Sequence, residues 1–245
     1  MCGHCSQDGR HKTQEFGETH ENICHDHQIQ LKLTMEKFTR LVATACPLNL
    51  PNLNTDQILP ARYLKWPRSR GLGAVLFQDM RFDASGKERA DFPLNQPIWR
   101  DTRILVAGRN FGGGSSREAA VYAVYDSGFR CVIAPSFGDI FAQNAVKNGL
   151  LLAVLPEADV TEIATAVAAN PTRQLEVDLE QQTVICGNRR YSFAIDAVSR
   201  NQLMNGWDDV DLTESYRGAI ASFVAEDRSR RPWAAPAPPE DPDKS

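Results

Sequence analysis

The sequence has 245 residues, of which 42% are hydrophobic and 24% charged, and its formal net charge is -4. A chain of this length and composition can bury one sizeable core, so we expect one globular body with tails. The acidic balance gives no sign of the basic surface that nucleic acid or an anionic membrane selects. Small molecules and other proteins are the partners that these numbers favour.

Neither a membrane span nor a secretory signal is expected. No apolar run reaches the roughly 18 residues of a spanning helix, and the N-terminal segment is polar. We therefore expect a cytoplasmic protein. The six cysteines lack the spacing of a disulfide framework, which favours free thiols.

Residues 1–34 are interpreted as a tail, because they show almost no apolar periodicity and contain all five histidines. This segment could offer four soft ligands to zinc, but the spacing of the candidate side chains is irregular. They are Cys2, Cys5, Cys24, His25 and His27. We favour a disordered or extraneous extension without a metal, with a zinc site as the alternative.

Residues 227–245 are interpreted as a second tail. The segment is rich in proline and charge, so it cannot bury enough apolar surface to offset the entropy of ordering it. The globular domain is therefore predicted to span residues 35–226.

Between the tails, short apolar runs alternate with helical patterns, which indicates an α/β domain with much parallel strand pairing. Residues 40–46 and 74–80 are the first two predicted strands. A buried strand over 103–108 is then followed by a helix over 115–128, in which Gly128 provides the stop.

The same strand and helix unit then repeats. A strand over 130–135 leads to a helix over 136–149, with Ser136 as its N-cap and Gly149 as its stop. The next predicted strand covers 150–156.

The last part of the domain combines one helix with a run of alternating character. The helix is predicted from Asp159 to Asn170. Residues 174–196 alternate with a period of two, which predicts a hairpin or a short meander.

The segment 108–120, GRNFGGGSSREAA, joins a predicted strand to a predicted helix. At such a junction, free backbone N–H groups and the positive end of the helix dipole bind negative charge. A nucleoside triphosphate loop would need lysine where Gly114 stands, and a dinucleotide loop would need glycine where Arg117 stands. Neither of these two ligands is favoured.

Helix capping alone explains part of this glycine loop. Ser115-x-x-Glu118 matches a capping box, which would stabilise the helix by roughly 1 kcal/mol. Capping does not explain Arg117, because a cation in the first turn opposes the helix dipole, and a bound carboxylate would remove that conflict. Two serines, three glycines and one guanidinium together predict a site for a small carboxylic acid. The residues are Gly112, Gly113, Gly114, Ser115, Ser116 and Arg117.

Three blocks of the sequence carry a family resemblance. They are GRNFGGGSSRE…GFRCVIAPSFGDIFAQNAVKNGLL from Gly108, PNLNTDQILPARYL over 51–64 and LMNGWDDVDLT over 203–213. From about Met35 to Phe223, their order and spacing closely resemble the small-subunit family of 3-isopropylmalate dehydratases, in the aconitase superfamily. The resemblance implies an α/β fold, the swivelling β/β/α domain of aconitase-like enzymes, with a mixed, mostly parallel sheet or barrel flanked by helices.

The resemblance also implies a reaction and a partner. The family isomerises 2-isopropylmalate and 3-isopropylmalate by dehydration and rehydration, a hydro-lyase step of leucine biosynthesis, together with a large subunit that carries a [4Fe–4S] cluster. This chain is expected to hold no cofactor or metal itself, because its cysteines outside the tail are isolated, at positions 46, 131 and 186. Its substrate would be a small hydroxy-dicarboxylic acid.

Roles follow from the resemblance position by position. Ser115 matches the serine taken as the catalytic base, with Ser116 beside it, and Arg117 matches the arginine that holds a substrate carboxylate. Asp56 matches an acidic residue of the active site and is assigned to catalysis with Ser115, the alternative being a solvated turn or cap before Ile58.

The loop over 61–71 lies where related subunits vary with the substrate side chain. The family often has one arginine here, whereas this chain has Arg68 and Arg70. Either of them could bind the carboxylate, and we favour Arg68.

Two positions depart from the family loop. Gly113 stands where the family usually has cysteine, and Ala119 stands where it has histidine. The residues assigned to chemistry are kept, but the substrate is left open. The alternatives are a paralogous hydratase for a citraconate, dimethylmalate or homoaconitate type of acid, and a non-catalytic binding protein of the same fold.

Overall fold

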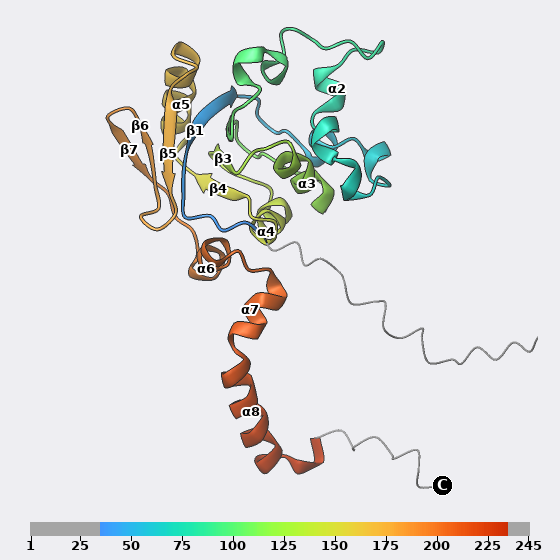
Figure 1. The fold of residues 1–245 in the computed structure, drawn as a ribbon, viewed down its shortest axis with the longest axis vertical. Helices are drawn as coiled ribbons and strands as arrows, with labels where there is room; N and C mark the ends of the chain where they lie inside the picture. Colours follow the sequence, from blue (N-terminus) through green and yellow to red (C-terminus); the bar gives the residue numbers. More distant parts are fainter. Residues whose placement is uncertain (1–34, 235–245) are drawn as a thin grey trace, which may run out of the picture. The chain divides into compact units, whose positions relative to one another are not determined.

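The computed structural model describes residues 35–234, so the predicted zinc ligands of the N-terminal tail lie outside the described residues. Within this range the strands form one sheet in the order β4-β3-β2-β1-β5-β6-β7 (Figure 1). Their bounds are β1 Arg40–Leu48, β2 Ile104–Ala107, β3 Cys131–Ala134, β4 Leu151–Val154, β5 Gln174–Asp178, β6 Thr183–Cys186 and β7 Arg189–Ser192.

One half of the sheet is parallel. Strand β1 pairs with β2, β2 with β3 and β3 with β4, all in parallel register. Every residue of β2 and β3 is buried, as expected for strands covered on both faces. The strand, helix and strand repeat predicted from residue 103 onward is therefore confirmed.

The other half of the sheet is antiparallel. Strand β1 also pairs with β5, which continues through β6 to β7 as the predicted meander. Residues in β5 alternate between buried and more exposed positions, so only one face of this half packs on the core. Strand β1 is thus the seam between the two halves.

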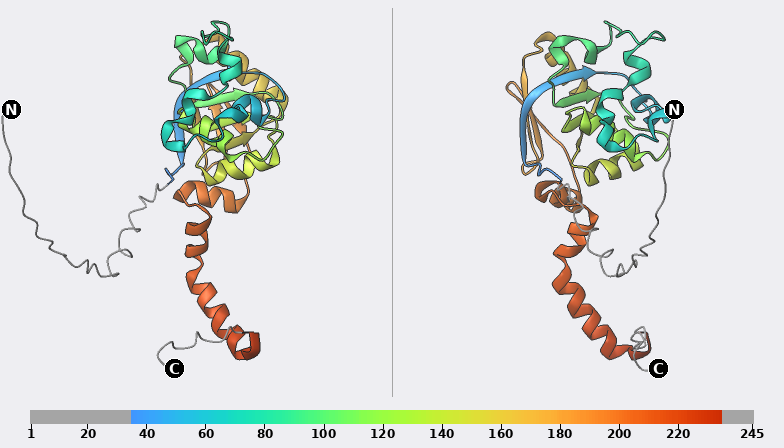
Figure 2. Two further views of the ribbon diagram at one scale, coloured as in Figure 1. Left: turned by 90° about the vertical axis from the view of Figure 1, so that its right-hand side faces the viewer. Right: turned by 45° about the vertical axis from the view of Figure 1, so that its right-hand side comes forward.

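Three helices connect or cover the parallel half, and the two views in Figure 2 show them beside the sheet. They are α3 Glu118–Asp126, α4 Asp139–Lys147 and α5 Glu157–Ala169. Gly128 and Gly149 take positive φ angles of 106° and 75° just after α3 and α4, which confirms both as helix stops. Helix α5 begins two positions before the predicted Asp159.

The two predicted serine caps are wrong. Helix α3 has Arg117 as its N-cap and α4 has Gly138, and neither cap makes a side-chain hydrogen bond. The Ser136 hydroxyl instead accepts a bond from the backbone N–H of Asn110 at 2.9 Å. Tertiary contacts of the glycine loop thus take the place of local capping.

The strand predicted over 74–80 is also wrong. This segment forms the 3-10 helix Leu72–Val75 and the short helix α2 Gln78–Arg81. A Cβ added to Gly73 would lie 2.4 Å from the backbone nitrogen of Ser127, so the turn packs directly on the end of α3. Its apolar residues reach the core from this turn rather than from a strand. Further 3-10 helices are Ala61–Tyr63, Arg68–Arg70, Pro93–Asn95 and Pro97–Trp99.

The described chain ends in helices. They are α6 Ala197–Asn205, α7 Asp209–Ser215, α8 Arg217–Arg230 and the 3-10 helix Pro232–Ala234. Helix α8 continues past Asp227, where the tail was predicted to begin, and none of its residues is buried. No helix within residues 35–234 is both long and apolar enough to cross a membrane.

Candidate functional site

The glycine loop after β2 is tied to the segment after β1 by main-chain bonds. Gly112 donates its N–H to the carbonyl of Leu53 at 2.7 Å, and Thr55 donates its N–H to the carbonyl of Gly113 at 2.9 Å. The Thr55 hydroxyl donates to the Ser115 carbonyl at 3.1 Å. Two segments that are far apart in the sequence therefore form one unit, at the end of neighbouring parallel strands.

The short helix α1 Thr55–Ile58 places Asp56 in this unit. Asn54 caps the helix, because its side chain accepts the N–H of Gln57 at 2.8 Å while the Gln57 side chain accepts the N–H of Asn54 at 2.9 Å. This reciprocal pair is a capping box, and it fixes the first turn in which Asp56 lies.

Asp56 and Arg117 form an ion pair through Oδ1 and Nη1. The Arg117 side chain is 19% exposed and that of Asp56 is 52% exposed, so the pair lies at the surface with the guanidinium more covered. The conflict between Arg117 and the α3 dipole is thus relieved by a carboxylate of the chain itself. The interpretation of Asp56 as only a solvated turn residue is incomplete.

Ser115 and Ser116 are both exposed. In the sequence they come directly before Arg117, the N-cap of α3. Among residues 35–234, neither hydroxyl forms a hydrogen bond with another residue. Since Ser115 is not the helix cap, its hydroxyl is available to a ligand.

The glycines shape the loop by close approach. A Cβ added to Gly112, whose φ is +74°, would lie 2.3 Å from the ring of the buried Phe141. Gly114 also has a positive φ, of +99°. A Cβ at Gly113 would lie 2.8 Å from the Asn110 side chain, which bonds to Asn52 at 3.1 Å. The side-chain amide of Asn110 therefore occupies space beside Gly113, the position at which the family resemblance expects cysteine.

Arg68 is engaged away from the two serines. Its guanidinium pairs with Asp126 near the end of α3 at 2.9 Å, donates to Asn148 at 3.3 Å and lies 4.3 Å above the centre of the Tyr122 ring. Arg70 stacks on Trp66 at 3.7 Å, and it has no carboxylate partner within the described chain. The structure does not bring Arg68 into contact with Ser115, Arg117 or Asp56.

The described cysteines offer no site for an iron–sulfur cluster. Cys46, Cys131 and Cys186 are buried free thiols on three different strands. Burial raises the pKa of Cys46 to about 12 and also raises the pKa of Cys131, which disfavours the thiolate that a cluster needs. Within residues 35–234, no group of three or more possible metal ligands is present.

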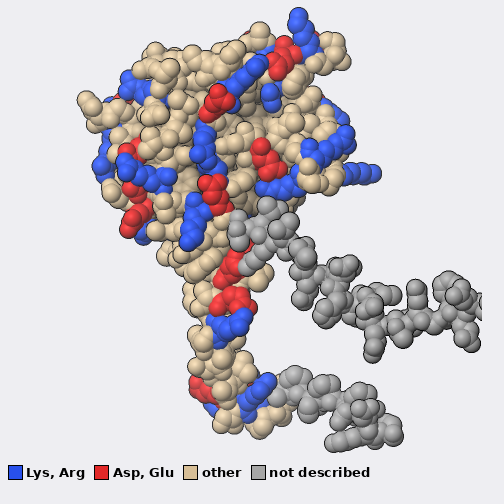
Figure 3. All heavy atoms as spheres, in the orientation of Figure 1, with Lys and Arg blue, Asp and Glu red and all other residues tan. Residues whose placement is uncertain are grey.

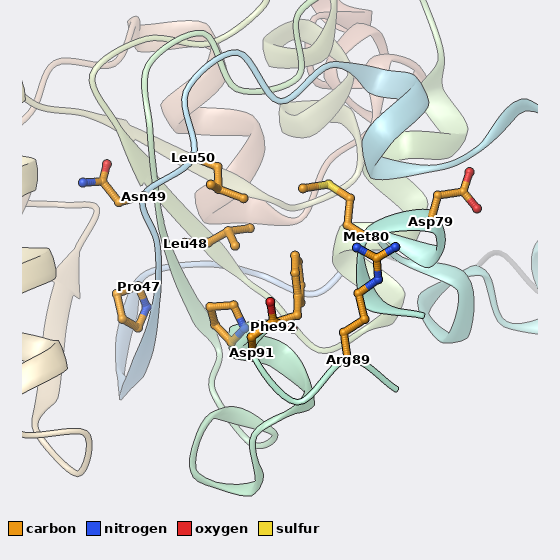
Figure 4. A pocket seen from close by; sticks show the side chains of 10 residues that line it. Pro47, Leu48, Asn49, Leu50, Asp79, Met80, Arg89, Asp91 and Phe92 are labelled. Carbon is orange, nitrogen blue, oxygen red and sulfur yellow. The ribbon is translucent and has the colours of Figure 1, made fainter. Parts of the chain in front are cut away.

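A pocket of about 400 Å³ lies near the loop that follows β1. Figure 4 shows Leu48, Leu50 and Phe92 facing this space, with Met80 opposite and Arg89 at the edge. None of the predicted site residues lines it. On the face of the molecule seen in Figure 3, charges of both signs are interspersed and form no continuous basic surface.

Sequence reasoning missed three residues that hold the site together. Asn54, Thr55 and Asn110 position the glycine loop and α1 through the bonds described above. The spacing Asn54-x-x-Gln57 was a readable capping signal. Nothing local in the sequence indicates the contact of Asn110 with Asn52.

The mixed sheet and the glycine loop that is held against α1 define an α/β domain of the aconitase swivelling class. The family model described as the aconitase C-terminal domain matches residues 35–158, and the model LeuD_N matches residues 161–197. The 3-isopropylmalate dehydratase small subunit of Rhodospirillum centenum is 47% identical over 201 residues, which is 82% of this chain and 99% of that protein. The protein of the same name from Dinoroseobacter shibae is 46% identical over 81% of this chain and 100% of its own length.

A solved structure agrees with these matches. A crystal structure of 3-isopropylmalate dehydratase (LeuD) from Methanocaldococcus jannaschii has a TM-score of 0.55 and 25% identity, covering 76% of this chain and 99% of that one. The chain belongs to the family of 3-isopropylmalate dehydratase small subunits.

Proposed function

We propose that this chain is the small subunit of a heteromeric hydro-lyase that interconverts 2-isopropylmalate and 3-isopropylmalate by dehydration and rehydration. The observation that carries the proposal is the exposed Ser115 hydroxyl, which forms no hydrogen bond with another residue of 35–234. It lies two positions before Arg117, which Asp56 holds in place. The names of the relatives favour this reaction over a paralogous hydratase or a non-catalytic protein.

Ser115 is proposed as the base that takes the proton from the carbon next to a substrate carboxylate. A serine hydroxyl is a weak base unless negative charge on its oxygen is stabilised. The N-terminus of α3, two positions after Ser116, supplies positive potential near this residue. Ser115 would first release its hydroxyl proton to solvent, and the resulting alkoxide would take the proton from carbon. That proton would then lie on Oγ of Ser115, where it can return in the reverse reaction.

Arg117 and Ser116 are proposed to hold the substrate carboxylate. A guanidinium has five N–H donors, and the ion pair with Asp56 engages the Nη1 group. Its other donors have no partner in the described part of the chain, so they could form the paired bonds that suit a carboxylate. Gly112, Gly113 and Gly114 would let the substrate approach the backbone closely.

The guanidinium for a second carboxylate is proposed to come from the loop over 61–71. Arg68 can serve only if it exchanges Asp126 for the substrate. Arg70 has no such competitor among the described residues, so its donors are available without a rearrangement.

A large subunit is proposed as the partner, in accordance with the small-subunit name of the relatives. The [4Fe–4S] cluster, which would act as the Lewis acid on the departing hydroxyl, is assigned to that partner because the described cysteines of this chain do not fit one. The isolated chain should therefore be inactive.

Turnover of the reconstituted complex by Ser115→Ala and Ser116→Ala tests the proposal. Removal of a general base should lower kcat about 10²- to 10⁴-fold in the first variant. The second variant should mainly raise KM, because Ser116 only binds. Unchanged kcat in Ser115→Ala would overturn the assignment of the base. Turnover of citraconate, dimethylmalate or homoaconitate in preference to isopropylmalate would overturn the proposed substrate.

A further inference from the structure

A hollow of about 340 Å³ lies between the 3-10 helix Leu72–Val75, the segment 94–100 and the end of α3. Two arginines line it, Arg81 and Arg100, so we call this space the arginine hollow. Its volume is at the lower end of the range of small-molecule sites. Four apolar side chains, none more than 8% exposed, also line the hollow: Leu76, Leu94, Trp99 and Phe129.

Arg81 is partly buried at this hollow and forms no ion pair within the described chain. Its Nη1 donates to the Leu76 carbonyl at 3.5 Å, the upper limit for a hydrogen bond, and its Nη2 has no partner among residues 35–234. The Phe82 ring, centred 5.3 Å from the guanidinium carbon, compensates the charge only in part. A charge withdrawn from water without a counter-ion costs free energy. The hollow therefore lacks a negative charge.

The charged groups around Arg81 do not supply that counter-ion. Burial lowers the pKa of the Arg81 guanidinium, the charge of Glu88 opposes this shift, and the charge of Arg100 adds to it. Glu88 itself pairs with Arg100 at 3.4 Å, and both of these side chains are about half exposed. Two cations thus share one carboxylate, which leaves one positive charge over at the hollow.

Asn95, which is only 6% exposed, holds the Arg81 guanidinium in a fixed orientation. Its Oδ1 accepts a hydrogen bond from Nε of Arg81 at 2.9 Å, and its Nδ2 donates to the carbonyls of Arg81 and Arg89 at 2.7 and 2.9 Å. The Nε side of the guanidinium is therefore occupied, while the edge with Nη1 and Nη2 can offer two parallel donors. A carboxylate matches this pair of donors.

We propose that the arginine hollow binds a small organic carboxylate, whose charge Arg81 neutralises and whose apolar body packs on Trp99 and its buried neighbours. An inorganic anion would leave the apolar lining unused, and a neutral molecule would leave Arg81 without a counter-charge. None of the residues proposed for the glycine-loop site lines the hollow, so this is a second site for a carboxylate. The inference goes beyond the proposed function and does not depend on it.

Calorimetric titration of the full chain with 4-methylpentanoate, a branched monocarboxylate, tests the inference. The amide of the same acid has its shape without its charge, and acetate has the charge without the apolar body. The acid should bind with a Kd of about 1 mM or lower, and the other two probes at least about 10-fold more weakly. Equal binding of acid and amide would overturn the inference, and so would the absence of binding by the acid at roughly 10 mM.

Three arginine variants locate the bound acid. Arg81→Gln should weaken Kd about 10-fold or more, whereas Arg190→Gln, which removes an exposed charge on β7, should change Kd less than about 2-fold. Arg117→Gln should also keep the Kd of the wild type, because Arg117 belongs to the glycine loop. Loss of binding in Arg117→Gln but not in Arg81→Gln would place the acid at the glycine loop and overturn the inference. Equal losses in Arg81→Gln and Arg190→Gln would reduce the effect to overall charge, with the same consequence.

Ala74→Leu tests the hollow without touching a charge, so it decides the matter even if Arg81→Gln fails to fold. Ala74 is exposed and lines the hollow, so a larger side chain there narrows the space. Binding of 4-methylpentanoate should weaken about 5-fold or more, while the unfolding midpoint is kept. Ala84→Leu, at an exposed position outside the lining, is the control and should leave Kd unchanged. An unchanged Kd in Ala74→Leu would show that the acid binds elsewhere.

Discussion

Arg117 and Asp56, which are 61 positions apart, join the N-cap of α3 to the first turn of α1 through an ion pair. The pair aligns the guanidinium at the start of a helix that would otherwise repel it. Asp56 is thus best described as a residue that positions Arg117.

Replacing Asp56 by Asn should impair the reaction more than the fold. The guanidinium would lose its anchor, so we expect KM to rise and kcat/KM to fall about 10-fold or more. The cost in unfolding free energy should stay below about 1 kcal/mol, because ion pairs at exposed sites contribute little. Steady-state kinetics of the complex and chemical denaturation of the chain measure the two effects.

Asp79→Asn is the matched control for this prediction. Asp79 pairs with Arg62 and is 57% exposed, close to the 52% of Asp56, but it lies outside the glycine loop and α1. Equal kinetic losses in the two variants would mean that Asp56 has no special relation to the site.

Substitutions of Arg68 and Arg70 should have different effects. Arg68→Ala removes an ion pair with Asp126 and a contact with the Tyr122 ring, so the free energy of unfolding should fall by about 1–2 kcal/mol. Arg70→Ala loses only its stacking on Trp66 and should raise KM with less effect on stability. Thermal unfolding and substrate titration distinguish the two. A KM effect confined to Arg68→Ala would return the carboxylate role to Arg68.

Gly112→Ala should destabilise the protein by about 2–4 kcal/mol, because the added methyl group overlaps the buried Phe141 ring at a positive φ. Gly86→Ala is the control, since Gly86 has a φ of +81° but nothing within 4 Å of an added Cβ. The free energy of unfolding of that variant should fall by only about 1 kcal/mol, which is the cost of placing alanine at a positive φ. Urea denaturation of both variants isolates the steric part.

At acidic pH, the ion pair between Lys147 and Asp209 should no longer contribute to the free energy of unfolding. A hydrogen bond from Lys147 lowers the pKa of Asp209, with a further bond from Gln202. A lowered folded-state pKa means that the stabilisation is present above the unfolded pKa of about 4 and is lost as pH falls through the folded value. Wild type should therefore exceed Asp209→Asn in stability at neutral pH, and the difference should close below about pH 4. A constant difference down to about pH 2 would contradict this origin.

The buried thiols should resist alkylation in the native chain. Cys46 and Cys131 have no exposed surface, and burial raises the pKa of both thiols, that of Cys46 to about 12. Reaction with iodoacetamide at neutral pH, followed by peptide mapping, should label them only after denaturation. Rapid native labelling of either residue would show that its strand opens.

Much of the fold could be predicted because its signals are local. The buried strands β2 and β3 are continuous apolar runs, and Gly128 and Gly149 mark helix ends by their positive φ. The segment 74–80 was predicted wrongly because its apolar residues have the composition of a strand. What decides its structure is the packing of Gly73 on the end of α3, which no local pattern records.

The residue types of the site could be predicted from the sequence, but the contacts between its distant segments could not. The glycine loop and Arg117 stand out by spacing and charge, but the capping box that the local pattern indicated at Ser115 is not formed. The carboxylate that neutralises Arg117 comes from a distant segment, so a single sequence gives no reason to pair it with Asp56. The ion pair between Arg68 and Asp126 likewise joins two distant segments, so the sequence alone gave no sign that Arg68 already has a carboxylate partner.

The bonds that join Leu53 and Thr55 to Gly112 and Gly113 use backbone atoms alone. Peptide groups are common to every residue other than proline, so this connection is retained when neighbouring side chains mutate. Side chains around the glycine loop can therefore change without breaking these main-chain bonds. The position of the loop against α1 thus depends on main-chain atoms, and its chemistry on the side chains that this frame carries.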